Sequence, residues 1–230
     1  MFPEHLRARL EAAHPLPSVV PYDFNTQGIR IDLSAANEAL QALVPQEVRM
    51  WESYIWNEIK RQGAELAAGG YLEKRGAYQQ SALFFENGEP RNIHLGVDIW
   101  VPAGTPIASP LPGVVHSVKN NQNFMDYGPT IVLQHEIDGF RFHTLFGHLT
   151  LDSLSGRQQG EVIGAGDVFA ALGDPEINGS WPPHLHLQIV IDMQGMEGDY
   201  FGLSAPSALS RFKQNCPDPN IILGYDLLKD

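Results

Sequence analysis

The chain has 230 residues, of which 43% are hydrophobic and 18% are charged, a profile typical of a globular protein and not of a disordered one. Its formal net charge is −12, from 27 acidic and 15 basic residues, which disfavours nucleic acid, anionic membranes and anionic cell-wall polymers as partners. The length suits one large domain, or a domain with an appendage. The single cysteine, Cys216, cannot form an internal disulfide and is expected to be a packed structural residue.

The N-terminal residues do not have the pattern of a secretory signal sequence. Several charged side chains fall within residues 4–11, and no apolar run follows that is long enough for a secretory signal or a membrane span. If Met1 is the natural start, the sequence therefore predicts a cytoplasmic protein.

Residues 34–70 have the pattern of helices. Ser34 can cap a first short helix, and Pro45 stands where a second helix could begin. Apolar residues then recur at the spacing of an amphipathic helix packed on a main domain, at Val48, Trp51, Tyr54, Ile55 and Ile59. Gly69 and Gly70 are expected to end this helix. We therefore expect an N-terminal helical segment over residues 1–70.

A β-rich domain is expected over residues 71–230. Short β-branched or aromatic runs, such as "PTIVLQHE" and "HLHLQIVI", are separated by Gly, Pro, Asn and Asp. With 17 prolines and 22 glycines, this pattern predicts a mainly β, antiparallel domain and an α+β chain overall. Residues 101–109 and 162–170 share Ala-Gly, two variable residues, an apolar residue and Ala, so we also expect a duplicated β unit.

The motif "PHLHL" places His184 and His186 two residues apart in front of an apolar run. On a strand these side chains point to the same face, about 6.5–7 Å apart, while Leu185 and Leu187 point to the other face. An apolar back and a histidine front are typical of a strand that carries a site. A half-exposed strand face would give the same pattern.

The motif "HLGVD" places His94 and Asp98 four residues apart, with Gly96 between them. A straight strand would separate them by about 13 Å, but a bend at the glycine can bring both side chains onto one cation. Two imidazole nitrogens and one carboxylate oxygen make a zinc ligand set that leaves a fourth position for water. The alternative is an ordinary His–Asp hydrogen bond.

The remaining histidines divide into one candidate and several structural residues. His148 follows Gly147 in "FGHL" and offers a further imidazole for proton transfer. His116, His135 and His143 lie in expected strands, and we expect them to be structural or surface residues.

Three motifs, "HLGVD", "FGHL" and "PHLHL", resemble in order and spacing those of the lysostaphin-type zinc metallopeptidases, which are cell-wall (peptidoglycan) endopeptidases. "AGTPIASPLPGVV" and "GEVIGAGDVFAALG" look like the framework of that family. The resemblance implies a small antiparallel β domain with a metal at the floor of a groove. It also implies one zinc ion held by His94, Asp98 and His186, with His148 and His184 as catalytic histidines.

The activity that the resemblance implies is hydrolysis of a peptide bond by a zinc-activated water. The chain has no glutamate of the HExxH kind, so the imidazoles must carry the acid–base chemistry. Which of the two catalytic histidines is the base stays open.

The chain departs from the family in the residues of the substrate groove and in the cellular compartment that is predicted for it. Where members have a Ser/Thr-Gly-rich turn this chain has "DPEINGSWPP", and Gln188 stands where members often have an acidic residue. We therefore expect an altered substrate groove that includes Asn178, Trp181 and Gln188. Intact peptidoglycan is not available in the cytoplasm, so the expected substrate is a small peptide or a muropeptide-like fragment.

Two other functions fit the same residues. The chain could be a non-catalytic peptide- or partner-binding module on this fold, or a zinc hydrolase of a non-peptide metabolite. The N-terminal segment could also cover the groove and supply a fourth ligand from His14, Asn25 or Asn37. The sequence names no protein partner.

Overall fold

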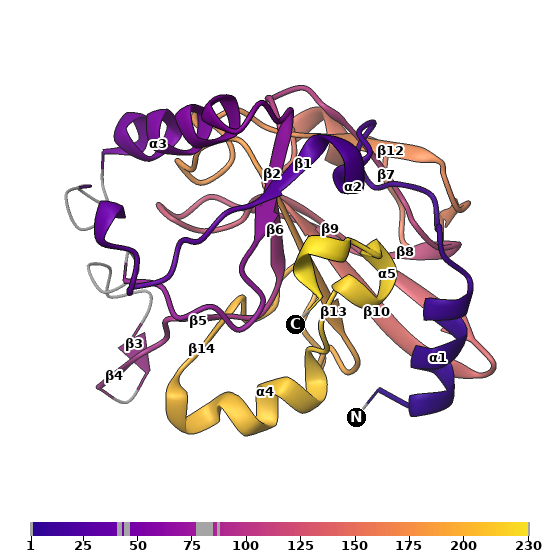
Figure 1. Ribbon diagram of the computed structural model, residues 1–230. Helices are drawn as coiled ribbons and strands as arrows, with labels where there is room; N and C mark the ends of the chain where they lie inside the picture. Colours follow the sequence, from indigo (N-terminus) through magenta and orange to yellow (C-terminus); the bar gives the residue numbers. More distant parts are fainter. Residues whose placement is uncertain (1, 41–42, 44–46, 77–84, 87, 230) are drawn as a thin grey trace.

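The computed structural model describes residues 2–40, 43, 47–76, 85–86 and 88–229, and within these ranges its main feature is an eight-stranded sheet (Figure 1). In spatial order the strands are β1 (Gly28–Arg30), β2 (Leu66–Gly69), β6 (Val97–Trp100), β13 (Leu185–Val190), β10 (Phe140–Gly147), β9 (Gly128–Ile137), β8 (Gly113–Asn121) and β11 (Val162–Ile163). Neighbouring strands are antiparallel except β1 and β2, which are parallel. The predicted mainly β, antiparallel fold is confirmed.

Smaller elements surround this sheet. Three two-stranded sheets pair β12 (Val168–Ala171) with β7 (Pro106–Ala108), β14 (Leu203–Ser204) with β5 (Ile93–His94), and β3 (Phe85–Glu86) with β4 (Glu89–Pro90) in the described ranges. The α-helices are α1 (Glu4–Ala12), α2 (Phe24–Gln27), α3 (Val48–Arg61), α4 (Leu209–Asn215) and α5 (Asn220–Leu223). Short 3-10 turns cover Glu38–Leu40, Leu151–Leu154, Pro206–Ala208 and Asp226–Leu228.

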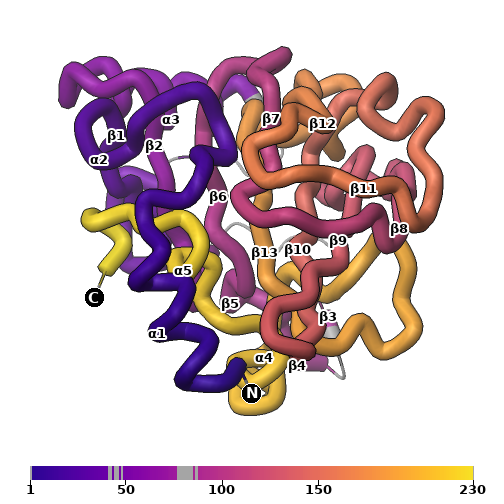
Figure 2. The backbone as a smooth tube through the Cα atoms, turned by 90° about the vertical axis from the view of Figure 1, so that its right-hand side faces the viewer, coloured from indigo at the N-terminus to yellow at the C-terminus, as the bar shows by residue number. Residues whose placement is uncertain are grey.

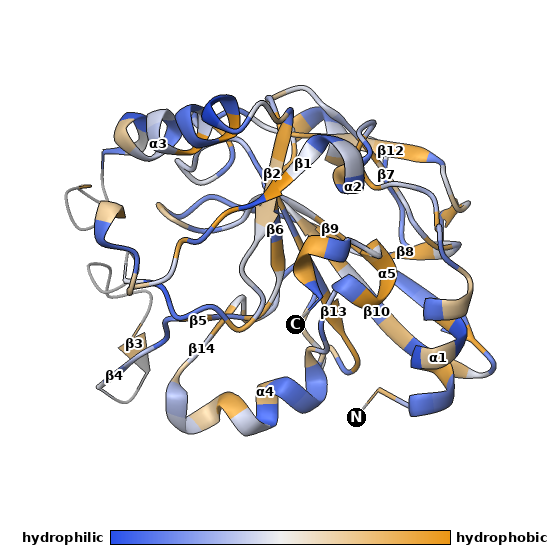
Figure 3. Cartoon of the chain, viewed as in Figure 1, coloured by the Kyte–Doolittle hydropathy of each residue, from blue (hydrophilic) through white to orange (hydrophobic). Residues whose placement is uncertain are grey.

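The two faces of the sheet pack against different layers because strand side chains alternate. On β13, Leu185, Leu187 and Ile189 are fully buried in the main core, which also takes side chains from α1 and α5. Figures 1 and 2 show α1 and α5 side by side, and Figure 3 shows hydrophobic colouring along the central strands. The opposite face carries His186 and Gln188, so the predicted apolar back and polar front of this strand are present.

Helix α3 confirms the amphipathic helix, but its predicted end is wrong. The helix stops at Arg61, because Gly63 (φ +68°) takes the left-handed conformation that glycine adopts without strain. The Ala64 N–H then donates to Ile59 O at 3.0 Å, which closes a Schellman motif. Residues 66–69 leave the helix and form β2. The predicted start at Pro45 lies outside the described residues.

The first 70 residues therefore contribute two sheet strands, which the sequence did not reveal, in addition to helices. The division between residues 1–70 and 71–230 stays a prediction. The two segments that echo each other in sequence lie side by side, because β7 and β12 pair with Ala108 opposite Val168. In the described part of the chain, each helix is too short or too polar to cross a lipid bilayer.

Candidate metal centre and catalytic cleft

Strand register and one bend bring the motif residues together. His186 on β13 lies opposite Asp98 on one neighbouring strand and opposite Gly147 on the other. His94 arrives from outside the large sheet, since β5 pairs with β14 and the chain turns before β6. A Cβ at Gly96 would lie 2.6 Å from His186 Cε1, so only glycine allows this close approach.

Three ligand atoms converge at this place. His94 Nε2 lies 3.0 Å from His186 Nδ1 and 3.3 Å from Asp98 Oδ1, and His186 Nδ1 lies 3.0 Å from the same carboxylate oxygen. All three side chains are at most 3% exposed. A tetrahedral ion with ligand bonds of about 2.0–2.1 Å separates its ligand atoms by about 3.3–3.4 Å. The spacing therefore fits a small metal ion with little adjustment.

The outer hydrogen bonds decide which nitrogens face inward. His94 Nδ1 lies 3.0 Å from Gly70 O, and a carbonyl only accepts, so the proton is on Nδ1 and the Nε2 lone pair faces the cluster. The Gln188 amide is fixed in the same way, because its Nε2 donates to Phe201 O at 3.0 Å. Its Oε1 then accepts from His186 Nε2–H at 3.0 Å, which leaves the Nδ1 lone pair inward.

The cluster therefore directs three acceptors at one another, an arrangement that a cation stabilises. A proton is a poor candidate at His94, because burial and the Arg75 guanidinium lower the pKa of that imidazole to about 4. Burial opposes ionisation of Asp98, but the Arg75 guanidinium outweighs it and holds the pKa of the carboxyl well below its usual range. A divalent metal ion fits this donor set of two imidazoles and a carboxylate.

Arg75 and Glu73 hold the second oxygen of Asp98. Residues 72–75 run beside residues 92–94, with Arg75 N–H donating to Asn92 O at 2.8 Å. From there Arg75 donates to Asp98 Oδ2 at 2.6 Å and to Glu73 Oε2 at 2.7 Å. Sequence reasoning missed both residues. Arg75 lies 23 positions before Asp98, and its charge looks like an ordinary surface charge in the sequence.

The two predicted catalytic histidines lie together beside the cluster. His148 Nδ1 donates to Asn178 O and His184 Nδ1 donates to Pro182 O, each at 2.7 Å, so both Nε2 atoms carry the lone pair. Their ring centres are 4.3 Å apart, and His184 Nε2 lies 3.7 Å from Asp98 Oδ1. Burial lowers the pKa of both imidazoles. Both are therefore unprotonated bases near neutral pH.

A cavity of about 290 Å³ opens over these five side chains. Trp181 lines it, with its indole N–H donating to Asp126 O at 3.2 Å. Asn178 is fully buried behind Trp181 and bonds to its backbone N–H and carbonyl. Gln188 is likewise buried behind His186. Of the three predicted groove residues, the structure thus places Trp181 at the cavity and the other two behind residues that line it.

Tyr127 is a further residue of the site that sequence reasoning missed. Its ring packs on His186 and His148, with centres 5.0 and 5.9 Å apart, and its hydroxyl lies 3.5 Å from His186 Nε2. Burial raises the pKa of the phenol well above its usual value, so the group stays protonated. Its position in the loop before β9 has no motif around it that the sequence could have shown.

The remaining candidates lie elsewhere. His14 bonds to Ile221 O, Asn25 to the backbone of Gly224 and Asp226, and Asn37 to Asp32 O and Tyr54. The fourth-ligand hypothesis therefore has no support from these three. Among the expected structural histidines, His135 and His143 are buried and His116 is half-buried. His135 bonds to Pro112 O and Thr144 Oγ1.

Buried metal-ligand clusters with adjacent proton acceptors define a class of metal-dependent hydrolase sites. In the sequence comparison, residues 92–197 match the model of Peptidase family M23. The resemblance to lysostaphin-type peptidases is thereby confirmed. No curated protein matches the chain significantly.

Solved structures similar to the chain include the following three. A protein of Pseudomonas aeruginosa assigned to peptidase M23 is 26% identical, over 57% of this chain and 44% of its own, with a TM-score of 0.37. The catalytic domain of lysostaphin from Staphylococcus simulans is 24% identical. The match covers 54% of this chain and 82% of that domain, with a TM-score of 0.36. A zinc-containing peptidase from Vibrio cholerae is 25% identical. The match covers 56% of this chain and 39% of that peptidase, with a TM-score of 0.35. The chain thus spans less than half of the first and third proteins.

Proposed function

We propose that the protein is a zinc-dependent peptidase that hydrolyses a peptide or amide bond in a peptide or muropeptide-like substrate. The observation that carries this proposal is the inward orientation of the lone pairs of His94, His186 and Asp98 beside two further unprotonated imidazoles. Bound at this cluster, one zinc ion would supply Lewis-acid polarisation of a carbonyl and acidify a water. The expected lack of nucleic acid and membrane partners stays a prediction.

The chemistry of the chain's own residues follows from their protonation. His148 and His184 each present a basic Nε2 while a backbone carbonyl fixes the other ring nitrogen. Either imidazole can accept the proton of the attacking water, and the imidazolium so formed can donate it to the leaving amine nitrogen. Tyr127 keeps its hydroxyl proton and can donate a hydrogen bond to a developing oxyanion in the cavity.

The first experiment is elemental analysis of the full chain, purified without a histidine tag, and of two variants. We expect about one zinc per chain in the wild type, as for a three-ligand site, and loss of that zinc in His186→Ala. His116→Ala is the matched control, since this half-buried imidazole lies outside the cluster and its loss should leave zinc in place. A wild-type chain that takes up no zinc on reconstitution would overturn the proposal.

Activity is then measured on a library of blocked peptides. Turnover that depends on zinc and is lost in His186→Ala supports a peptidase. Stoichiometric zinc with no cleavage of any peptide would favour a binding module or the hydrolysis of a non-peptide metabolite instead.

A further inference from the structure

The cavity is lined by residues from segments outside the matched domain as well as by residues within it. The N-terminal segment contributes Leu33, Trp51 and Ile55, and the C-terminal segment contributes Phe201 and Leu203. The matched residues 92–197 supply the polar floor and further wall residues, among them Trp100, Met125 and Trp181. The floor of histidines is polar, and the walls above it are mostly apolar, with Arg91, Asp126 and Asp199 also at the lining. This composition is expected of a specific pocket.

The N-terminal wall is joined to the floor by two sets of contacts. Leu33 N–H donates to Glu73 Oε1 at 3.0 Å, and Glu73 in turn accepts from Arg75, the partner of Asp98. Ile55 and Leu33 also pack in one apolar cluster with Trp100, whose ring stacks on His184 at 5.6 Å. This wall is therefore held in place by the same framework that holds the site.

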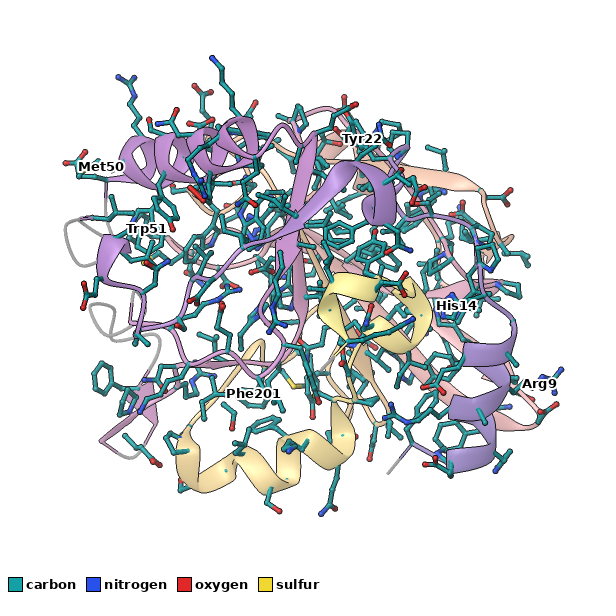
Figure 4. The ribbon with its side chains drawn as sticks, in the orientation of Figure 1. Arg9, His14, Tyr22, Met50, Trp51 and Phe201 are labelled. Carbon is teal, nitrogen blue, oxygen red and sulfur yellow. The ribbon has the colours of Figure 1, made fainter. Side chains whose placement is uncertain are left out.

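The lining residues of the C-terminal segment are also held by packing and a hydrogen bond. The Phe201 ring packs on Phe212 of α4 with centres 5.5 Å apart, and its carbonyl accepts from the buried Gln188 amide. Leu203 packs with Met125 and Trp181. Figure 4 shows Trp51 below α3 and Phe201 above α4, and both residues line the cavity.

From these walls we propose that the substrate carries a bulky apolar or aromatic side chain next to the scissile bond. The inference rests on the proposed peptidase function and narrows its class of substrate. A glycine-rich peptide has no side chain to cover the apolar wall residues, so these would stay in contact with water. Burial of one leucine or phenylalanine side chain is expected to favour such a substrate by about 10- to 100-fold. Trp51 is a specificity residue in this scheme because it lines the wall of the cavity.

The test compares zinc-loaded full chain on three blocked peptides: pentaglycine, and the same peptide with a central phenylalanine or leucine. We expect kcat/KM to be at least about 10-fold higher for the phenylalanine and leucine peptides. Trp51→Ala should lower that ratio by reducing kcat/KM on the phenylalanine and leucine peptides. Met50→Ala is the matched control, since Met50 is a neighbour on α3 that is 38% exposed and absent from the cavity lining. Equal rates on all three peptides would overturn the inference.

A binding measurement separates this inference from the proposed function. Calorimetric titration of the zinc-loaded chain with phenylalanine hydroxamate and glycine hydroxamate compares two side chains on one zinc-binding group, without any turnover. Tighter binding of the phenylalanine compound, reduced in Trp51→Ala, supports the pocket even if no peptide is cleaved. Equal affinity, or no binding of either compound, contradicts it.

Discussion

Replacement of Gln188 by leucine tests the orientation of His186 directly. The side chain is fully buried, and its amide joins His186 Nε2 to Phe201 O by two bonds of 3.0 Å. Leucine has a similar size but neither accepts nor donates. In Gln188→Leu the imidazole N–H would keep only the Tyr127 hydroxyl, 3.5 Å away, and Phe201 O would lose its donor.

The magnitude follows from these two losses. A buried polar group left without a partner costs about 1–3 kcal/mol, and His186 can avoid that cost by moving its proton to Nδ1. That tautomer points N–H at Asp98 and removes a metal ligand. Loss of such an outer partner typically weakens metal binding by about 10- to 100-fold, and we expect a decrease in zinc affinity of this size.

Competition with a chromophoric zinc chelator measures the affinity of wild type, Gln188→Leu and Gln188→Glu. Glutamate retains an acceptor for His186, so Gln188→Glu should bind zinc more tightly than Gln188→Leu. Thermal unfolding of the metal-free proteins shows whether each variant is folded. If a folded Gln188→Leu bound zinc as tightly as the wild type, the inference that Gln188 sets the tautomer of His186 would be refuted.

Three further outcomes are expected. His148→Ala and His184→Ala should each retain zinc by elemental analysis but lose about 10²- to 10⁴-fold in peptide turnover, and loss of zinc from both would assign them to the metal cluster. Arg75→Met should destabilise the metal-free chain by about 3–5 kcal/mol in urea unfolding, because it leaves the Asp98 carboxylate buried without a cation. An unchanged midpoint would contradict the contribution of this ion pair. Burial lowers the pKa of His135 from 6.5 to about 4. As the pH falls, the unfolded chain therefore binds a proton at His135 before the folded chain does. The contribution of His135 to the free energy of unfolding should be fully present above pH 6.5. It should decrease by about 3 kcal/mol as the pH falls to 4. Urea unfolding at pH 7 and pH 4.5 should show a smaller change in the free energy of unfolding for His135→Gln than for the wild type. An equal change would exclude His135 as a source of the pH dependence.

The parts of the site that the sequence predicts are those encoded by local spacing. His184 and His186 face one side because they are two apart at a strand, and Gly96 marks the bend that brings His94 to Asp98. These rules need only neighbours in the chain. The motif therefore reveals the cluster before any pairing of strands is known.

The supporting residues depend on contacts that local spacing does not encode. Tyr127 reaches His186 only after β9, β10 and β13 are in register, and Arg75 reaches Asp98 only because residues 72–75 lie beside 92–94. The predicted end of α3 is wrong for a related reason. Ala67 and Ala68 favour helix by propensity, but both are fully buried in β2, where tertiary packing decides.

The N-terminal segment is expected to be part of the site and not a removable cover. Gly69 on β2 pairs directly with Asp98, and Gly70 O accepts the proton that fixes the His94 tautomer. Deletion of residues 1–70 removes both contacts and exposes the edge of β6. We therefore predict that a 71–230 chain loses zinc binding and unfolds at a lower temperature than the full chain, measured by elemental analysis and circular dichroism. A shortened chain that stays folded, holds zinc and cleaves peptides faster would instead show that this segment inhibits the enzyme, because only a blocking segment can raise activity by its removal.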